Sequence, residues 1–363
     1  MPTARSGAAV PSRATVAATD RATRTTETQM QIDIKTADIK PIRNTFDHVA
    51  KRLGKDKPAS RYQEATYDIQ PVVNFHYRPL WDPDHELYDE RRTALKMEDW
   101  YAFRDPRQYY YGTWTMTRAR QQDHMEKNFA FFEKRHLVDV MPEEWRAKVA
   151  QLLVPLRHVE YAANLNNTYM AAYGYGTAIT QACQYSALDH LGIAQYLSRI
   201  GIVVADGDTV ALDEGKQAWV EDEVWQPLRR LCEDLLVTKD WFELYVAQNL
   251  VLDGLLYPLA YDRFDTAISQ HGGSALAMLT EFALEWFGES TRWVDATLKT
   301  AAAESDDNKA LIEGWANVWG DRVAEALGPL ARAEFGEAGD ETLAEIRSEL
   351  AARSLKKSKI TLA

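Results

Sequence analysis

Apolar and polar residues recur with the period of an α-helix along most of this chain of 363 residues. Within the stretch 276–299, four large apolar residues fall on one stripe at about 100° per residue: Leu279, Phe282, Trp286 and Trp293. This pattern predicts an amphipathic helix with one face in a core. Glu281 lies about 130° from the centre of the stripe, so we expect it to face away from that core.

Helix start signals place two further helices. Asp105-Pro106-Arg107 predicts a helix with Asp105 as its N-cap and Pro106 in its first turn, running to about His136. Met141-Pro142-Glu143-Glu144 repeats the signal, because its two acidic residues face the positive end of the helix dipole. The helical pattern that follows is expected to kink at Pro155 and to run to about Tyr175, and it resumes through Ala187 and Tyr196 to Gly201.

Glycine and proline punctuate the second half of the chain. Residues 201–215 predict a loop or small hairpin, with Asp213 as the cap of the next helix. Residues 240–267 predict a helix bent at Pro258, and His271-Gly272-Gly273 is expected to end it. Strand signals are almost absent, so the chain is predicted to be all-α.

Four regions are predicted along the chain. Residues 1–30 are rich in Ala, Thr, Ser and Arg without hydrophobic periodicity, which predicts a disordered tail. Residues 31–104 are punctuated by proline and predict an extended arm that wraps a partner. Residues 105–300 predict a helical bundle, and residues 301–363 predict extra C-terminal helices.

Aromatic and arginine residues of the kind enriched at protein interfaces gather in the arm and at the start of the bundle. The candidates for contact with another subunit are Tyr77, Arg78, Trp81, Trp100, Tyr109 and Trp114. The alternative is that the arm packs on its own domain. If the arm binds a partner, deleting the residues up to Trp100 should weaken assembly and leave the bundle helical.

Charge and cysteine content narrow the class of protein. A formal net charge of −12 and a pI near 5.2 argue against nucleic acid and membranes as partners. Cys183 and Cys232 form no spacing motif, so reduced thiols in a cytoplasmic protein are expected. No apolar run of the sequence approaches the roughly 18 residues that a membrane span needs.

A carboxylate-bridged di-iron bundle would show two Glu-x-x-His pairs, since residues i and i+3 of a helix converge on one metal. The residues three beyond Glu281, Glu285 and Glu289 are leucine, glycine and arginine. The single pair of this kind, Glu133-Lys-Arg-His136, falls at a predicted helix end, where a surface ion pair and a helix cap explain it at least as well. We therefore predict no catalytic, cofactor-binding or metal-binding residue.

Other polar residues of the predicted helices lack metal-ligand spacing. His158 and Glu160 are two apart and point about 200° apart, and His190 follows Asp189 near a predicted helix end. The amides of Asn164, Asn166 and Asn167 are expected to form hydrogen bonds in the bundle centre, where a relative would hold metal.

Three blocks of the sequence carry a resemblance to a known family: DPRQYYYGTWTM at 105–116, EYAANL at 160–165 and LTEFALEWFGESTRW at 279–293. They resemble the β subunit of bacterial multicomponent monooxygenase hydroxylases, most closely the phenol hydroxylase branch, beside the toluene and methane enzymes. The resemblance implies a ferritin-like subunit without iron ligands, in an assembly of two α, two β and two γ chains.

The same resemblance implies a division of work within that assembly. A reductase that uses NADH and a small regulatory protein would serve the complex, and the di-iron centre would lie in the α subunit. The α subunit would hydroxylate phenol or a related aromatic with O₂, while this chain would be a noncatalytic scaffold.

Two other functions stay open on the sequence. One is a di-iron oxygenase or reductase-type enzyme in its own right with unusual ligands, and the other is a free-standing helical adaptor. Stoichiometric iron on this polypeptide alone would favour the enzyme. The lack of any partner in native mass spectrometry would favour the adaptor.

Overall fold

The computed structural model describes residues 45–55, 57–72 and 77–363. The predicted tail, residues 1–30, and the first part of the predicted arm lie outside the described residues. Within the described ranges every regular element is a helix and there is no strand, as the sequence predicts. No helix among them is long and apolar enough to span a bilayer.

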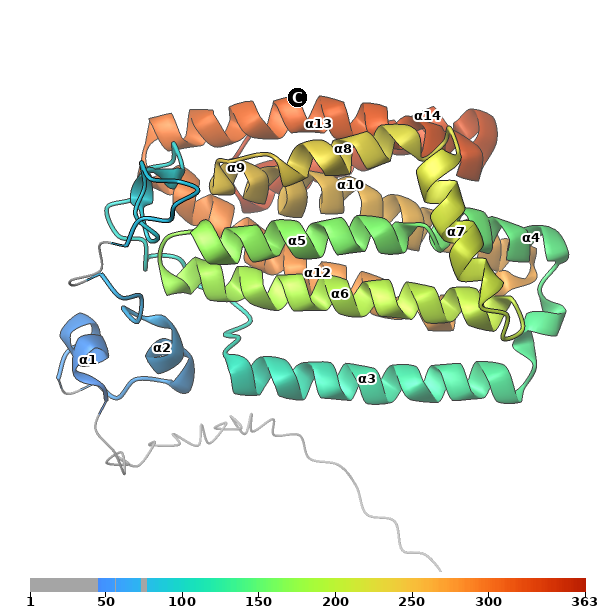
Figure 1. Ribbon diagram of the computed structural model, residues 1–363, viewed down its shortest axis with the longest axis horizontal. Coiled ribbons are helices and arrows are strands. Elements are labelled where there is room, and N and C mark those ends of the chain that lie inside the picture. The colour runs from blue at the N-terminus through green and yellow to red at the C-terminus, as the bar shows by residue number, and fades with distance from the viewer. Residues whose placement is uncertain (1–44, 56, 73–76) are drawn as a thin grey trace, which may run out of the picture. The chain divides into compact units, whose positions relative to one another are not determined.

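Long helices form the body of the protein (Figure 1). They are α3 Tyr111–Lys134, α5 Leu156–Tyr173, α6 Thr177–Val204, α8 Gln226–Leu236, α12 Ser274–Glu304, α13 Asp306–Phe335 and α14 Gly339–Lys357. α5 and α6 lie side by side and run antiparallel, because only residues 174–176 join them. α14 returns along α13, and α12 contacts α3, α6 and α13.

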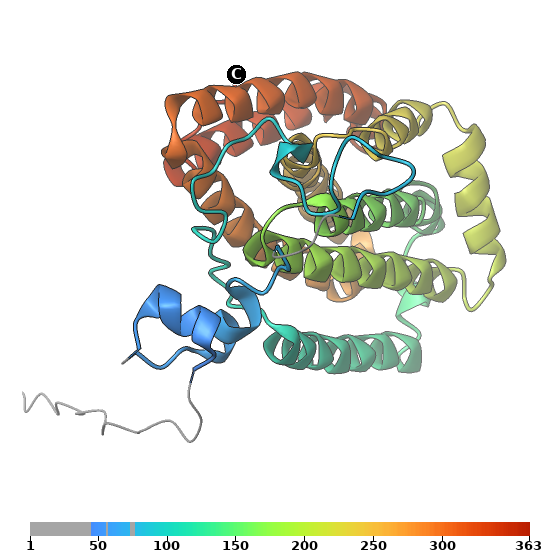
Figure 2. The same cartoon turned by 60° about the vertical axis from the view of Figure 1, so that its left-hand side comes forward.

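The centre of the bundle is a continuous helical line that alternates α and π turns and lies between α5 and α13 (Figures 1 and 2). Its segments are α9 Trp241–Tyr245, η4 Val246–Leu252, α10 Asp253–Tyr257, η5 Pro258–Arg263, α11 Phe264–Ile268 and η6 Ser269–Gly273. From residue 241 to 261 almost every side chain is buried. A helix that is apolar on all faces is expected to occupy such a central position.

The amphipathic helix predicted from the sequence is confirmed as α12. Leu279, Phe282, Trp286 and Trp293 are all buried, and Glu281 is exposed on the opposite face. The kink predicted at Pro155 is also confirmed. A π turn, η3 Val149–Leu153, follows the short helix α4 Glu143–Lys148, and α5 begins directly after Pro155.

The helix start predicted at Asp105 is wrong, because α3 begins six residues later, after Tyr110. The carboxylate of Asp105 accepts hydrogen bonds from the backbone and the guanidinium of Arg107, 2.9 Å away in each case. Gln108 then adopts a positive φ of 52°, which no α-helix can contain. Residues 105–107 therefore form a turn that holds the buried ion pair between Asp105 and Arg107.

The loop predicted at 201–215 is also wrong. α6 continues through Gly201 to Val204, and α7 Val210–Glu221 begins after a short turn, with Asp213 inside its first turn rather than at its cap. A Cβ atom on Gly201 or on Gly215 would lie 2.9 Å from a methyl group of Val154. The two glycines allow helices to approach this valine closely, and they do not mark a loop.

The helix end predicted at 271–273 is wrong as well, since the π turn η6 joins α11 to α12 without leaving the helix. A π turn accommodates an additional residue within a continuous helix. The bend predicted at Pro258 coincides with another such turn, η5.

The described part of the predicted arm contains two short α-helices, α1 Asp47–Leu53 and α2 Arg61–Thr66, one 3-10 turn, η1 Glu90–Arg92, and irregular chain. Its last residues belong to the core of the bundle, where Leu95, Met97, Trp100 and Phe103 are buried. The later part of the arm therefore packs on its own domain, and the wrapping of a partner stays a prediction.

Candidate functional site

Three ionisable side chains meet in the centre of the bundle, each from a different helix. Glu160 comes from α5, His190 from α6 and Asp253 from α10, and all three are buried. Nδ1 of His190 lies 2.6 Å from Oε2 of Glu160, and its Nε2 lies 3.6 Å from Oδ2 of Asp253. The imidazole is therefore held between two carboxylates in the apolar core.

Tyrosine and amide side chains complete this polar centre. The hydroxyl of Tyr257 donates to the carboxylate of Glu160, 2.9 Å from both oxygens, and Tyr261 lies 3.5 Å from Oε1. The amide of Gln248 donates to Oδ1 of Asp253 over 2.8 Å. These donors offset part of the cost of burying two carboxylates.

The asparagines of α5 behave as the sequence predicts. Asn166 donates to Gln248 over 2.8 Å, and Asn167 exchanges hydrogen bonds of 3.1 and 3.2 Å with Asn249. Asn166 and Asn167 are buried, so their amides do pair in the bundle centre. Their partners come from the π turn η4, which places two adjacent amides against α5.

The pKa values of His190 and Glu160 are both higher in the folded chain than the usual values of these side chains. Burial alone would lower the pKa of His190, but the charge of Asp253 and the contact with Glu160 raise it to about 10. Burial raises the pKa of Glu160, although His190 and Tyr257 oppose the shift. The raised pKa favours the imidazolium form of His190, whose positive charge offsets that of a neighbouring carboxylate.

These residues do not fit a pair of iron ions. A bundle di-iron centre uses a lone Glu from each of two helices and a Glu-x-x-His pair from each of two others. Here there is one Glu, one Asp and one His, the residue three beyond Glu160 is Ala163, and each donor already faces another side chain. In the described ranges no three His, Cys, Asp or Glu side chains converge on a metal position. Glu133 and His136 are exposed at the end of α3, far along the chain from this centre.

A second ionic cluster joins α3 to α6 and α12. Arg118 of α3 pairs with Asp189 over 2.6 Å and with Glu289 over 2.8 Å. The indole N–H groups of Trp114 and Trp286 donate to the same Asp189 carboxylate, over 2.9 and 3.0 Å. Trp286 also lies edge-on to His190, with ring centroids 4.7 Å apart. The side chain of Trp286 therefore contacts both the ionic cluster and the polar centre.

The six interface candidates fall into two groups. Trp100 and Tyr109 are buried in this chain, and Trp114 is partly buried and holds Asp189, so these three offer little surface to a partner. The side chains of Tyr77, Arg78 and Trp81 are exposed on one loop. A single chain does not test an interface, so all six stay predictions.

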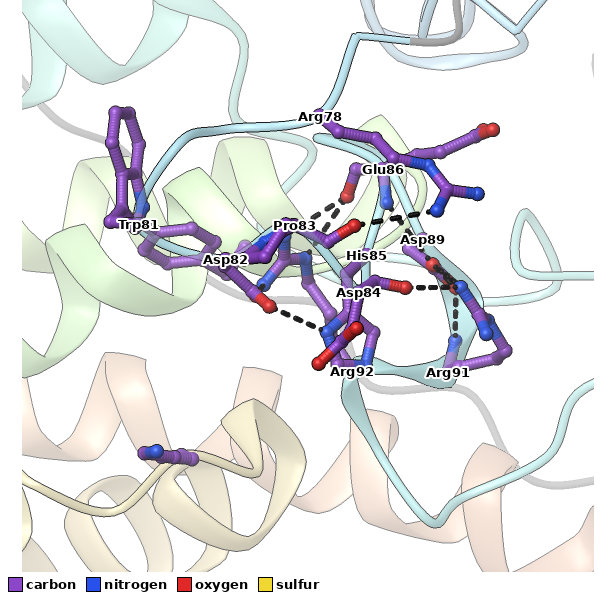
Figure 3. Close-up of polar contacts among 12 residues, drawn as sticks. Arg78, Trp81, Asp82, Pro83, Asp84, His85, Glu86, Asp89, Arg91 and Arg92 are labelled. Atoms are coloured by element: carbon purple, nitrogen blue, oxygen red, sulfur yellow. Dashed lines mark hydrogen bonds and ion pairs between the residues drawn. The ribbon is translucent and has the colours of Figure 1, made fainter.

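A hollow of the described surface lies beside this loop, and Figure 3 shows some of the residues that line it. We call it the arm hollow; it measures about 690 Å³, and its lining includes Trp81, Asp82, Arg92, Tyr169, Tyr173 and Val237. The guanidinium of Arg92 is fixed by Asp82 over 2.5 Å and by the backbone oxygen of Glu86 over 3.0 Å. It also lies 4.9 Å from the ring centre of Tyr173.

Sequence reasoning missed the polar centre because its members are far apart along the chain. Glu160 and His190 are 30 residues apart, and His190 lies in the middle of α6 rather than near a helix end. A weak signal was present, since a histidine surrounded by Ile, Leu and Ala at helical spacing is expected to be buried and therefore paired.

Comparison with known proteins identifies the family to which this chain belongs. A family model described as methane/phenol/alkene hydroxylase matches residues 81–305. The chain is 53% identical to the phenol 2-monooxygenase oxygenase component DmpL of Pseudomonas sp. strain CF600, over 89% of this chain and 97% of that relative. It is 28% identical to the β subunit of the toluene-4-monooxygenase hydroxylase component of Ectopseudomonas mendocina, over 79% of this chain and 90% of that subunit.

Solved structures agree with these matches. The crystal structure of xenon-pressurized phenol hydroxylase from Pseudomonas sp. OX1 superposes with a TM-score of 0.84 and 48% sequence identity. The superposition covers 91% of this chain and 99% of the solved chain. The helical bundle is therefore of the ferritin-like type that the sequence predicts.

Proposed function

Because the chain belongs to the methane/phenol/alkene hydroxylase family, we propose that it is the noncatalytic β subunit of a multicomponent di-iron aromatic hydroxylase. The family resemblance read from the sequence is confirmed, and the relatives are oxygenase or hydroxylase components of multicomponent monooxygenases. The substrate is phenol or a related aromatic, by analogy with the relatives' names.

The observation that carries the proposal is the polar centre of the bundle. A catalytic chain would place iron ligands where this chain has Glu160, His190 and Asp253 bound to one another and to tyrosine and amide side chains. The protonated imidazole supplies the positive charge that the two buried carboxylates need. This chain then supplies a rigid, metal-free bundle against which a catalytic subunit assembles.

The proposed partners follow from the same division of work. The di-iron centre lies in an α subunit, and this chain joins α and γ subunits in an α2β2γ2 assembly in the cytoplasm. A small regulatory protein and an NADH-dependent reductase act on the complex. In this assembly the β chain stabilises the catalytic subunit and takes no part in the chemistry.

Metal analysis tests the proposal. The full chain, purified alone and incubated with Fe(II) under anaerobic conditions, should retain much less than one iron per chain after desalting. The same chain co-expressed with the other hydroxylase subunits should co-purify with iron, and phenol turnover should require the co-expressed subunits. Stoichiometric iron on the isolated chain would contradict the proposal and would favour an enzyme with unusual ligands.

A further inference from the structure

The arm hollow is bordered by apolar side chains that the chain itself leaves in solvent. Val237 and Trp81 line it and are 72% and 70% exposed, and Leu80, next to Trp81 in the sequence, is 94% exposed. Leu236 beside Val237 is exposed as well. Apolar groups gathered around one hollow, rather than scattered singly, mark a surface that a partner covers.

The walls of the hollow are already rigid. The hydroxyl of Tyr173 accepts the indole N–H of Trp81 over 3.2 Å, and its ring lies tilted against that of Tyr169, with ring centroids 4.6 Å apart. Tyr169 in turn donates to the backbone oxygen of Lys239 over 2.9 Å. These contacts join three segments without a ligand: the loop after Tyr77, the end of α5 and the turn before α9. A preformed site of this kind loses little conformational entropy on binding.

The exposed charge around the hollow is positive, although the chain carries a net charge of −12. Among the lining residues, Arg91 and Lys239 are exposed cations, and Asp84 is the one exposed carboxylate. The remaining acidic groups are occupied: Asp82 binds Arg92 and His85, and Asp240 accepts the backbone N–H groups of Ala94, Phe242 and Glu243. Arg91 pairs with the buried Asp89 but keeps more than half of its side chain in solvent (Figure 3).

From these contacts we propose that the arm hollow receives a segment of another subunit of the same hydroxylase, with a large apolar side chain next to a carboxylate. The apolar side chain packs between Trp81, Val237 and Tyr173, and the carboxylate meets Lys239 and Arg91. This inference rests on the proposed function, because it takes the occupant from the same assembly. Trp81 and Val237 supply most of the binding energy, and the cations increase the rate at which the acidic segment associates.

Binding of the purified catalytic subunit to the full chain tests the inference. Trp81→Ala and Val237→Asp should each weaken the affinity by about tenfold or more, as loss of an interface anchor does. Lys239→Glu should slow association and should reduce its dependence on ionic strength. Val318→Asp is the matched control, because Val318 is an exposed valine of α13, outside the hollow, and its substitution should leave the affinity unchanged.

The outcomes separate this inference from the proposed function. If the unaltered chain binds the catalytic subunit and the two anchor variants bind equally well, the hollow is not the docking site. If the unaltered chain does not bind at all, the proposed function fails together with this inference. If the hollow instead mediates self-association, light scattering will show a dimer that Trp81→Ala dissociates, which would also overturn the assignment. Unchanged circular dichroism of each variant shows that these exposed substitutions leave the fold intact.

Discussion

At the scale of single residues, the most consequential group is the imidazole of His190. It is buried between two carboxylates, and its pKa rises to about 10 because their charges outweigh the effect of burial. A buried charge of this kind contributes little net stability, but removing one partner leaves the others uncompensated. The cluster therefore fixes how α5, α6 and α10 fit together more than it adds to the free energy of unfolding.

The raised pKa gives stability a definite dependence on pH. Between about 6.5 and 10 the folded chain keeps a proton on His190 that the unfolded chain releases, so the unfolding free energy falls as pH rises. His190→Gln cannot titrate, so its unfolding free energy should decrease less over this range. Urea unfolding at pH 6.5 and pH 9 measures the difference, and equal slopes for both proteins would contradict a protonated His190.

The same substitution should lower stability at pH 7 by roughly 3–5 kcal/mol, because Glu160 and Asp253 would lose their buried counter-charge. Glu160→Gln in the same chain should recover part of this loss, since it removes one of the two uncompensated carboxylates. The double variant thus separates loss of charge balance from loss of packing around the ring.

At the scale of helices, α3 is the one whose attachment depends most on a few polar residues. Arg118 reaches Asp189 on α6 and Glu289 on α12, and its side chain is largely buried. Arg118→Met should leave the buried Asp189 without its charged partner and should loosen α3 by roughly 2–4 kcal/mol. Amide hydrogen exchange should then accelerate along residues 111–134 and stay unchanged along 241–261.

Arg199→Met is the matched control for this prediction. Arg199 of α6 also pairs with α3, through Glu126 over 2.8 Å, but both side chains are substantially exposed. An exposed pair contributes about 0–1 kcal/mol, so exchange along α3 should change little. Equal acceleration in both variants would show that α3 is held by general packing rather than by the buried ionic cluster.

Most helices were predictable because periodicity is a local property of the sequence. The stripe of α12 and the interruption at Pro155 follow from spacing and from proline chemistry alone. The failures share a physical cause, since they depend on contacts far along the chain. Gly201 and Gly215 lie inside helices and leave room for the side chain of Val154, and Asp105 forms an ion pair instead of a cap.

The site shows the same limit more strongly. Local spacing correctly predicted paired amides around Asn166 and Asn167, because polar residues in the middle of a buried helix need partners. It could not pair Glu160 with His190 or Asp253, because nothing in the sequence fixes which faces of three helices meet. The family resemblance predicted a bundle without iron ligands but not what fills its centre.

At the scale of the whole molecule, the boundary between arm and bundle lies earlier than the sequence predicts. Leu95, Met97 and Trp100 belong to the bundle core, and Asn308 of α13 binds both the backbone N–H and the carbonyl of Lys96. A deletion up to Trp100 would therefore remove core residues and destabilise the bundle itself. A loss of assembly after that deletion would not identify a partner contact.

A shorter deletion separates the two effects. Removing residues 1–72 leaves this core segment and the arm hollow in place, although it removes the ion pair of Arg52 with Asp99 and the hydroxyl of Tyr62 that accepts the backbone N–H of Asp105. The shortened chain should keep its helical circular dichroism, because the long helices all lie after residue 72. Its Tm should fall, because the deletion removes the buried side chains of Tyr62, Thr66 and Tyr67. Pull-down of the catalytic subunit should then weaken if the arm wraps its partner, and unchanged capture would restrict the interface to the bundle and the arm hollow.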